Sequence, residues 1–179
     1  MKEWEVLSDE EYKLVWGNIY DTFKFNPKFE ETINEKEFLE LPKPFKVYDM
    51  HLFTNYLKDD SVVIDDDYYN NFNKLITDIF INCMGTDEFL YVLDWQHSSF
   101  RYNPKSEDKM PRFLETEEYN IYFPDFYPDG DYYLFVAKDL SWGYFTHPWK
   151  QELWIFGEML LKEIEKIPSI YLTLKKTSL

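Results

Sequence analysis

Hydrophobic residues recur at helical spacing in two segments of the chain. The first segment, SDEEYKLVWGNIYDTF, begins at Ser8, and Glu11 follows three residues later, an arrangement in which each side chain can bond a free amide at a helix start. Acids also open the second segment, DDDYYNNFNKLITDIFINCMG, and Gly85 lies just past its end. Both segments therefore predict amphipathic helices. The hydrophobic positions are Tyr12, Val15, Trp16, Ile19, Tyr20 and Phe23 in the first, and Phe72, Leu75, Ile76, Ile79, Phe80 and Cys83 in the second.

After Gly85 the pattern changes to one typical of strands. EFLYVLDWQHSSFRYNP is rich in aromatic and β-branched residues on both faces, which predicts an interior strand that ends near its polar residues. DYYLFVA, WGYFTH and QELWIF follow in close succession and predict a three-strand meander. Gly157 ends the meander, and EMLLKEIEKI predicts a closing helix that Pro168 terminates.

The remaining segments carry weaker patterns. Residues 26–44 indicate a loop with a short turn of helix at 35–39, and FKVYDMHLF is a candidate strand. Residues 103–128 hold four prolines and many charges, which predicts a long surface excursion with a short extended piece at 119–123. The last residues look frayed.

These elements together predict an α+β fold. Helices are expected to pack on a mostly antiparallel sheet, with the three-strand meander and the closing helix at the C-terminal end. The 179 residues suit one globular domain over 1–179.

Charge limits the classes of partner. The 34 acidic and 19 basic residues give a formal charge of −15, which opposes direct binding to nucleic acid or to an anionic membrane. A basic protein partner is electrostatically easier, although net negative charge can also serve solubility alone. The N-terminus lacks a signal-peptide pattern and no long apolar run follows, so a cytoplasmic protein without membrane contact is expected. Cys83, the single cysteine, fits a reducing compartment and is interpreted as a buried hydrophobe.

Candidate catalytic residues stand at the ends of two predicted strands. His97 in DWQH lies two residues after a tryptophan, and His147 in THPW lies two residues before one. Asp94 lies three residues before His97. If the two strands are neighbours, an imidazole pair and a carboxylate could do acid and base chemistry in one cavity. Strand alternation places Asp94 and His97 on opposite faces, so direct contact between them requires a bulge or a bend. A structural role at the strand ends is the alternative.

Other chemistry finds little support in the sequence. The histidines lack the spacing of zinc ligands, and no glycine-rich phosphate loop is present, so neither a metal site nor a cofactor is predicted. The aromatic residues allow a stacking surface for a sugar or nucleobase, although such residues more often form a core. The candidate binding residues are Trp95, Gln96, Trp142 and Trp149.

Three segments carry a resemblance to a known family. LDWQHSSFRYNP, DGDYYLFVAKDLSWGYFTHPW and ELWIFGEMLL, in that order, resemble an uncharacterised bacterial family, domain of unknown function 2716 (DUF2716). The resemblance is densest over residues 89–161. It implies a bacterial origin and a shared fold, and it names no reaction.

Two classes of function remain open. The first is a protein-binding domain without catalysis, of the immunity or inhibitor type, in which aromatic and acidic side chains meet a basic surface. The second is a small-molecule enzyme or ligand-binding domain with a pocket around His97 and His147. A pocket lined by both histidines would favour the second, and burial of both rings in a filled core would favour the first.

Overall fold

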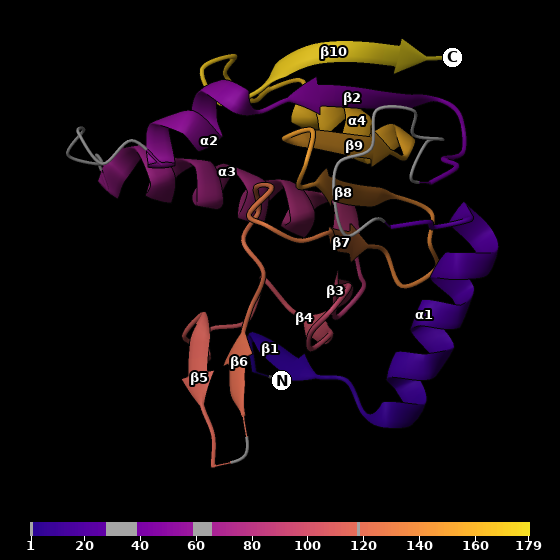
Figure 1. Ribbon diagram of the computed structural model, residues 1–179, viewed down its shortest axis with the longest axis vertical. Helices are drawn as coiled ribbons and strands as arrows, with labels where there is room; N and C mark the ends of the chain where they lie inside the picture. The colour runs from indigo at the N-terminus through magenta and orange to yellow at the C-terminus, as the bar shows by residue number, and fades with distance from the viewer. Residues whose placement is uncertain (1, 28–38, 59–65, 118) are drawn as a thin grey trace.

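One antiparallel sheet organises the molecule (Figure 1). The computed structural model describes residues 2–27, 39–58, 66–117 and 119–179. Within these ranges the sheet has eight strands in the order β1-β4-β3-β7-β8-β9-β2-β10, and each recorded pairing is antiparallel. The strands are β1 (Trp4–Val6), β2 (Phe45–Asp49), β3 (Leu90–Asp94), β4 (Phe100–Tyr102), β7 (Tyr133–Val136), β8 (Gly143–His147), β9 (Glu152–Phe156) and β10 (Thr173–Ser178).

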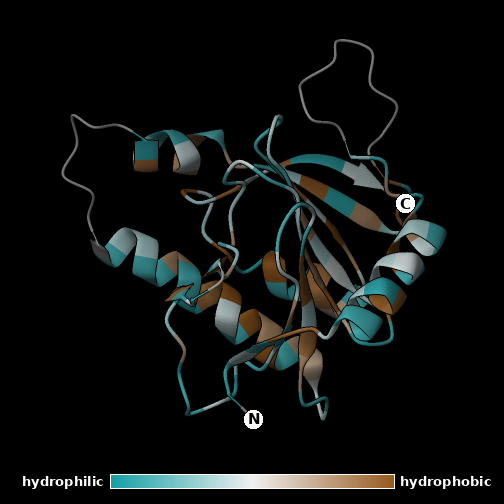
Figure 2. Ribbon diagram, turned by 60° about the horizontal axis from the view of Figure 1, so that its bottom comes forward, coloured by the Kyte–Doolittle hydropathy of each residue, from teal (hydrophilic) through white to brown (hydrophobic). Residues whose placement is uncertain are grey.

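Helices pack on both faces of this sheet. The described helices are α1 (Asp9–Phe23), α2 (His51–Lys58), α3 (Asp66–Met84) and α4 (Glu158–Ile164). One cluster of buried residues joins α1 to residues such as Phe145 and Phe156, and another joins α3 and α4 to Phe135 and Tyr144. In Figure 2 the helices alternate between hydrophilic and hydrophobic colours, as amphipathic helices do. The α+β fold with its mostly antiparallel sheet is therefore confirmed.

The first predicted helix forms as its sequence indicates. The hydroxyl of Ser8 accepts a hydrogen bond from the amide of Glu11 at 3.3 Å, and the helix ends at Phe23, before Lys24, whose φ of 49° is left-handed. The buried side of the helix consists of Val15, Trp16, Ile19 and Phe23. Tyr20 was predicted on the same face but is 42% exposed.

The predicted meander is also confirmed. Strands β7, β8 and β9 pair in sequence order, and α4 follows directly after Gly157. Alternation along β8 sends Tyr144 into the cluster under α3 and Phe145 into the cluster under α1. The sheet is consequently buried on both faces at its centre.

Three predictions need correction. FKVYDMHLF is not one strand, because the carboxylate of Asp49 accepts the amide of His51 at 3.0 Å and α2 begins there. The excursion at 103–128 contains a hairpin of β5 (Phe113–Glu115) and β6 (Asn120–Tyr122), which includes the predicted extended piece. Nor does this excursion stay on the surface, since Phe126 is 1% exposed. The last residues form β10, which pairs with β2.

Two further observations complete the fold. The turn of helix expected at 35–39 falls almost wholly outside the described residues. Among the helices that the structure describes, none has the length and apolar character needed to cross a membrane.

Candidate functional site

A bend at the end of β3 brings two predicted site residues together. Asp94 is the last residue of β3 and lies opposite Tyr133 of β7. The chain bends over residues 95–97, and the amide of Trp95 donates to the carbonyl of Tyr132 at 3.2 Å. His97 thereby returns toward the strand end, and its Nδ1 lies 3.0 Å from Oδ1 of Asp94. The bend that strand alternation required is present.

A second carboxylate completes the cluster. Oδ2 of Asp131, which precedes β7, lies 3.5 Å from the same Nδ1 of His97. The side chains of Asp94 and Asp131 are 6% and 9% exposed, whereas that of His97 is 64% exposed. Two buried carboxylates therefore share one imidazole that reaches solvent. We call Asp94, His97 and Asp131 the strand-end cluster.

Burial shapes the protonation of both carboxyl groups. Loss of hydration raises the pKa of Asp94 to about 6, and the hydrogen bond and charge of His97 offset only part of this rise. The neighbouring Asp131 adds repulsion, and its own pKa is also raised, chiefly by burial. The cost of removing the charged carboxylate of Asp94 from water is thus larger than the stabilisation that its single imidazole partner provides.

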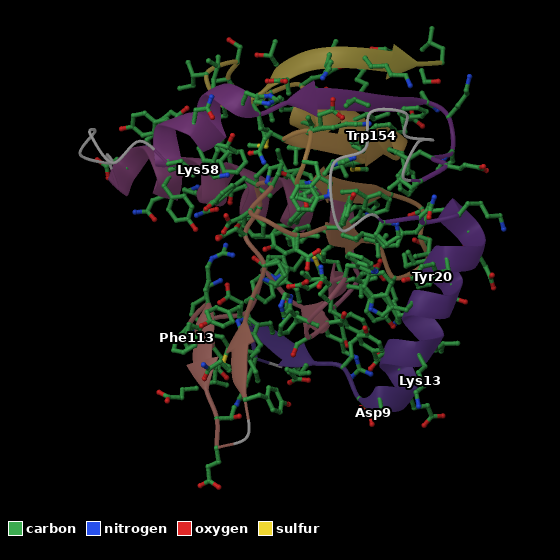
Figure 3. All side chains as sticks on the ribbon, in the orientation of Figure 1. Asp9, Lys13, Tyr20, Lys58, Phe113 and Trp154 are labelled. Carbon is green, nitrogen blue, oxygen red and sulfur yellow. The ribbon has the colours of Figure 1, made fainter. Side chains whose placement is uncertain are left out.

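The cluster opens into a pocket of about 310 Å³ beside the hairpin. We call this the hairpin pocket; Asp94 and His97 line it, and Asp131 is not among its lining residues. Figure 3 labels Phe113, which lies on the β5 strand of the hairpin. The other lining residues are Tyr69, Arg112, Phe113, Tyr122, Phe123, Pro124, Asp125, Asp129 and Tyr133.

Arg112 is the one arginine among the lining residues, and it is held by the pocket wall. Its Nη1 donates to the carbonyl of Pro124 at 2.7 Å and lies 3.5 Å from Oδ1 of Asp125. The guanidinium also stacks on the ring of Phe126, 4.7 Å from its centroid. Asp125 accepts a further hydrogen bond from the hydroxyl of Tyr69 at 2.6 Å. This cation is thereby committed to the wall and not to the strand-end cluster.

His147 does not join the pocket. Its side chain is fully buried, its ring packs on Tyr132 at 5.3 Å between centroids, and its Nδ1 accepts the amide of Lys150 at 3.4 Å. Along β8 it shares a face with Phe145, on the α1 side, whereas Asp94 follows Leu90 and Val92 on the α3 side. The condition for both histidines to face one cavity is not met, because β7 lies between β3 and β8, and Asp94, the partner of His97, lies on the other side of the sheet from His147.

The predicted tryptophan platforms also lie elsewhere. Trp142 is 6% exposed and stacks on Phe80 in the core, so it offers no free face. Trp95 and Trp149 are partly buried against the α1-side cluster. Gln96 is exposed, and its amide donates weakly to Asp94 at 3.4 Å. None of these four residues lines the hairpin pocket.

The molecule contains a second histidine–aspartate pair. Nδ1 of His51 lies 2.9 Å from Oδ2 of Asp49, and their side chains are 50% and 31% exposed. Burial acts to raise the pKa of Asp49, but the hydrogen bonds from the ring and amide of His51 outweigh it, so this pKa lies below its ordinary value. Lys175 also lowers it. This exposed pair serves below as the reference for the strand-end cluster.

Sequence reasoning missed Asp131 and the hairpin wall. Asp131 stands in PDGDYY, where Asp129 and Gly130 indicate a turn and hide the carboxylate that follows. The available signal was position: Asp131 is the first residue of the predicted strand DYYLFVA. Only the pairing of β3 with β7 brings the two carboxylates to one edge.

Comparisons with known proteins identify relatives without naming an activity. Residues 6–161 match the sequence profile described as "Protein of unknown function (DUF2716)". The chain is 26% identical over 177 residues to "Uncharacterized protein YxiI" of Bacillus subtilis (strain 168), covering 95% of this chain and 97% of that protein. No solved structure matches the chain.

Proposed function

The chain belongs to the DUF2716 family of proteins of unknown function, and we propose from its own residues that it binds a positively charged ligand in the hairpin pocket. The observation that carries this proposal is the charge of the strand-end cluster. Asp94 and Asp131 have side chains more than nine-tenths buried and share the single ring of His97. In the described part of the chain, no lysine or arginine pairs with either carboxylate.

The physical reason is the cost of burying charge. A carboxylate removed from water is destabilised unless a cation or several donors compensate it. One imidazole can neutralise at most one of two carboxylates, so the cluster keeps a net negative charge when both are ionised. A cation entering the pocket supplies the missing charge.

The pocket walls support a cation as well. Asp129 also lines the pocket and adds a carboxylate to it, and Tyr69, Tyr122 and Tyr133 are among the other lining residues. Aromatic faces attract cations by about 0.5–2 kcal/mol each, depending on exposure. Because Arg112 is committed to Pro124 and Asp125, it does not cancel this preference.

A ligand series tests the proposal. Calorimetric titration would compare an aliphatic diamine, a guanidinium compound and a divalent metal ion with a dicarboxylate at equal ionic strength. We expect at least one of the cations to bind, the dicarboxylate not to bind, and Asp94→Asn to weaken cation binding at least about tenfold. Asp49→Asn is the matched control and should leave binding unchanged. Binding of the dicarboxylate alone, or an equal loss in both variants, would contradict the proposal.

A second candidate is the protein-binding domain of the immunity or inhibitor type. The hairpin supports it, because Phe113, Tyr119 and Tyr122 are 45%, 52% and 59% exposed. Exposed aromatic anchors on a protein of charge −15 suit a basic protein surface. We place either activity in the cytoplasm, where the lone Cys83 stays reduced.

Tyr119 separates the two candidates, since it is exposed and does not line the pocket. If the hairpin docks a basic protein, Tyr119→Ala should weaken that complex by at least about tenfold, the effect of a modest aromatic anchor. Cation binding should remain unchanged in the same variant. Chemical crosslinking with a panel of purified basic proteins measures the first effect, and calorimetry measures the second.

A further inference from the structure

We propose that Asp94, His97 and Asp131 form a site for one divalent transition-metal ion of the zinc class. This inference names the ligand of the hairpin pocket and so rests on the function proposed above. The sequence alone predicted no metal site, because the histidines lack the spacing of zinc ligands.

The positions of the three donor atoms support the site. Nδ1 of His97 lies 3.0 Å from Oδ1 of Asp94 and 3.5 Å from Oδ2 of Asp131, and one donor atom of each residue lies within 4.8 Å of the others. Zinc holds nitrogen and oxygen ligands at about 2.0–2.2 Å, so neighbouring ligands of a tetrahedral ion are about 3.3–3.6 Å apart. The observed separations lie close to this value, and small rotations of the side chains suffice to bind an ion.

The kinds of donor indicate which ions fit. An imidazole nitrogen suits zinc, iron, nickel and copper, and carboxylates suit magnesium, calcium and manganese as well as zinc. One histidine with two aspartates therefore favours Zn²⁺ or Mn²⁺ over Mg²⁺ and Ca²⁺, which prefer oxygen ligands alone. The two positive charges of the ion also balance the two buried carboxylates.

Neighbouring groups orient the donor atoms of the site, and the site is open to the hairpin pocket. Oδ1 of Asp131 accepts the amide of Tyr132 at 2.7 Å, which leaves Oδ2 facing His97. Such outer contacts orient metal ligands. Asp94 and His97 line the pocket, so an ion between them has its free coordination position toward the pocket space. Three protein ligands with an open position are the pattern of a metal site that can take water or a ligand.

The reference pair shows what a histidine–aspartate contact lacks on its own. His51 and Asp49 make a contact of similar length, but the described residues provide no third donor there. Lys175 lies near enough to lower the pKa of Asp49, and a cation at that place opposes binding of another. His51→Gln is therefore the matched control for His97→Gln.

The test uses metal alone on the full chain after treatment with a chelator. Equilibrium dialysis against Zn²⁺, Mn²⁺ or Mg²⁺, followed by elemental analysis, gives the number of ions and their affinity. We expect one Zn²⁺ per chain, Mg²⁺ at least tenfold weaker, and a loss of at least tenfold in zinc affinity for His97→Gln and Asp131→Asn. Binding of Co²⁺ should give visible absorption in the unmodified chain and in His51→Gln, and not in His97→Gln.

The outcomes separate this inference from the proposed function. If Zn²⁺ binds no more tightly than Mg²⁺, or if His97→Gln binds zinc normally, the metal site is wrong. If metals fail but a diamine binds and Asp94→Asn abolishes it, the metal site is wrong and the cation pocket stands. If no cation binds, both the metal site and the proposed cation-binding function are wrong. Because His97 is largely exposed, His97→Gln should fold, and its unfolding midpoint checks this.

Discussion

The two histidine–aspartate pairs have nearly the same contact distance and different surroundings. His97 meets Asp94 at 3.0 Å and His51 meets Asp49 at 2.9 Å, in both cases through Nδ1. The carboxylate of Asp94 is 6% exposed and that of Asp49 is 31% exposed. Their pKa values move in opposite directions, since that of Asp94 is raised to about 6 and that of Asp49 is lowered.

This contrast shows that the contact alone does not make a site. At Asp49, the hydrogen bonds from His51 and the charges of His51 and Lys175 together outweigh the desolvation cost, and Asp49 accepts the amide of His51 at the start of α2. At Asp94, burial and the second carboxylate of Asp131 outweigh the same imidazole contact. A buried charge that the fold leaves undercompensated is typical of binding and catalytic sites. The strand-end cluster has this property and the reference pair does not.

The largest expected effect is the change in the free energy of unfolding when the charge of Asp94 is removed. Folding raises the pKa of Asp94 from 3.8 to about 6, so its contribution to stability is fully present below about pH 4 and lost as the pH rises through 6. Asp94→Asn should therefore raise the free energy of unfolding at pH 8 by roughly 1 to 3 kcal/mol. Urea unfolding in the presence of a chelator measures the change.

Asp49→Asn should act in the opposite direction. Its lowered pKa contributes stability above the unfolded pKa, and that contribution is lost as the pH falls through the folded value. We expect a loss below about 1 kcal/mol at pH 8, as for an exposed pair. Stabilisation by both variants, or by neither, would remove the contrast between the two carboxylates.

The next effect concerns the imidazoles. His97→Ala leaves the buried oxygens of Asp94 and Asp131 without their shared donor, which should cost about 1 kcal/mol at pH 7. His51→Ala should change stability by less than about 0.5 kcal/mol, because water replaces the exposed ring. Thermal unfolding of both variants measures the difference. Equal losses of stability in the two variants would mean that burial of the carboxylate does not change how much the histidine–aspartate contact stabilises the fold.

The smallest effect is the coupling between the two carboxylates of the cluster. Since the charge of Asp131 raises the cost of ionising Asp94, Asp131→Asn should stabilise less in the Asp94→Asn background than alone, by about 0.5–1 kcal/mol. The cycle of Asp49→Asn with Asp131→Asn should instead be additive within about 0.5 kcal/mol. Denaturant unfolding of the three single and two double variants tests both cycles. A coupling of equal size in the control cycle would indicate a global effect of net charge.

Local patterns predicted the elements whose causes are local. Ser8 and Glu11 marked the start of α1, and the spacing of Phe72, Ile76 and Phe80 marked the buried face of α3. The meander β7-β8-β9 was readable because neighbouring strands are joined by short turns. Such features depend on residues that lie close to one another in the sequence.

Long-range pairing explains the failures. The last residues form β10 because β2, more than a hundred residues earlier, offers a free edge; Thr173 lies opposite Asp49. Asp131 joins Asp94 only because β7 lies beside β3. His147 and His97 both follow predicted strands, but whether those strands are neighbours and which face His147 takes depend on strand order and register, which the isolated strands do not reveal. The site therefore required the structure.

The most direct test of the central claim follows the three imidazole rings of the unmodified protein by long-range nitrogen–proton NMR while Zn²⁺ is added. We expect the Nδ1 signal of His97 to shift to that of a metal-bound ring at one equivalent, and the signals of His51 and His147 to stay in place. If His51 responds first, or if His97 remains unchanged in excess zinc, the strand-end cluster is not the metal site.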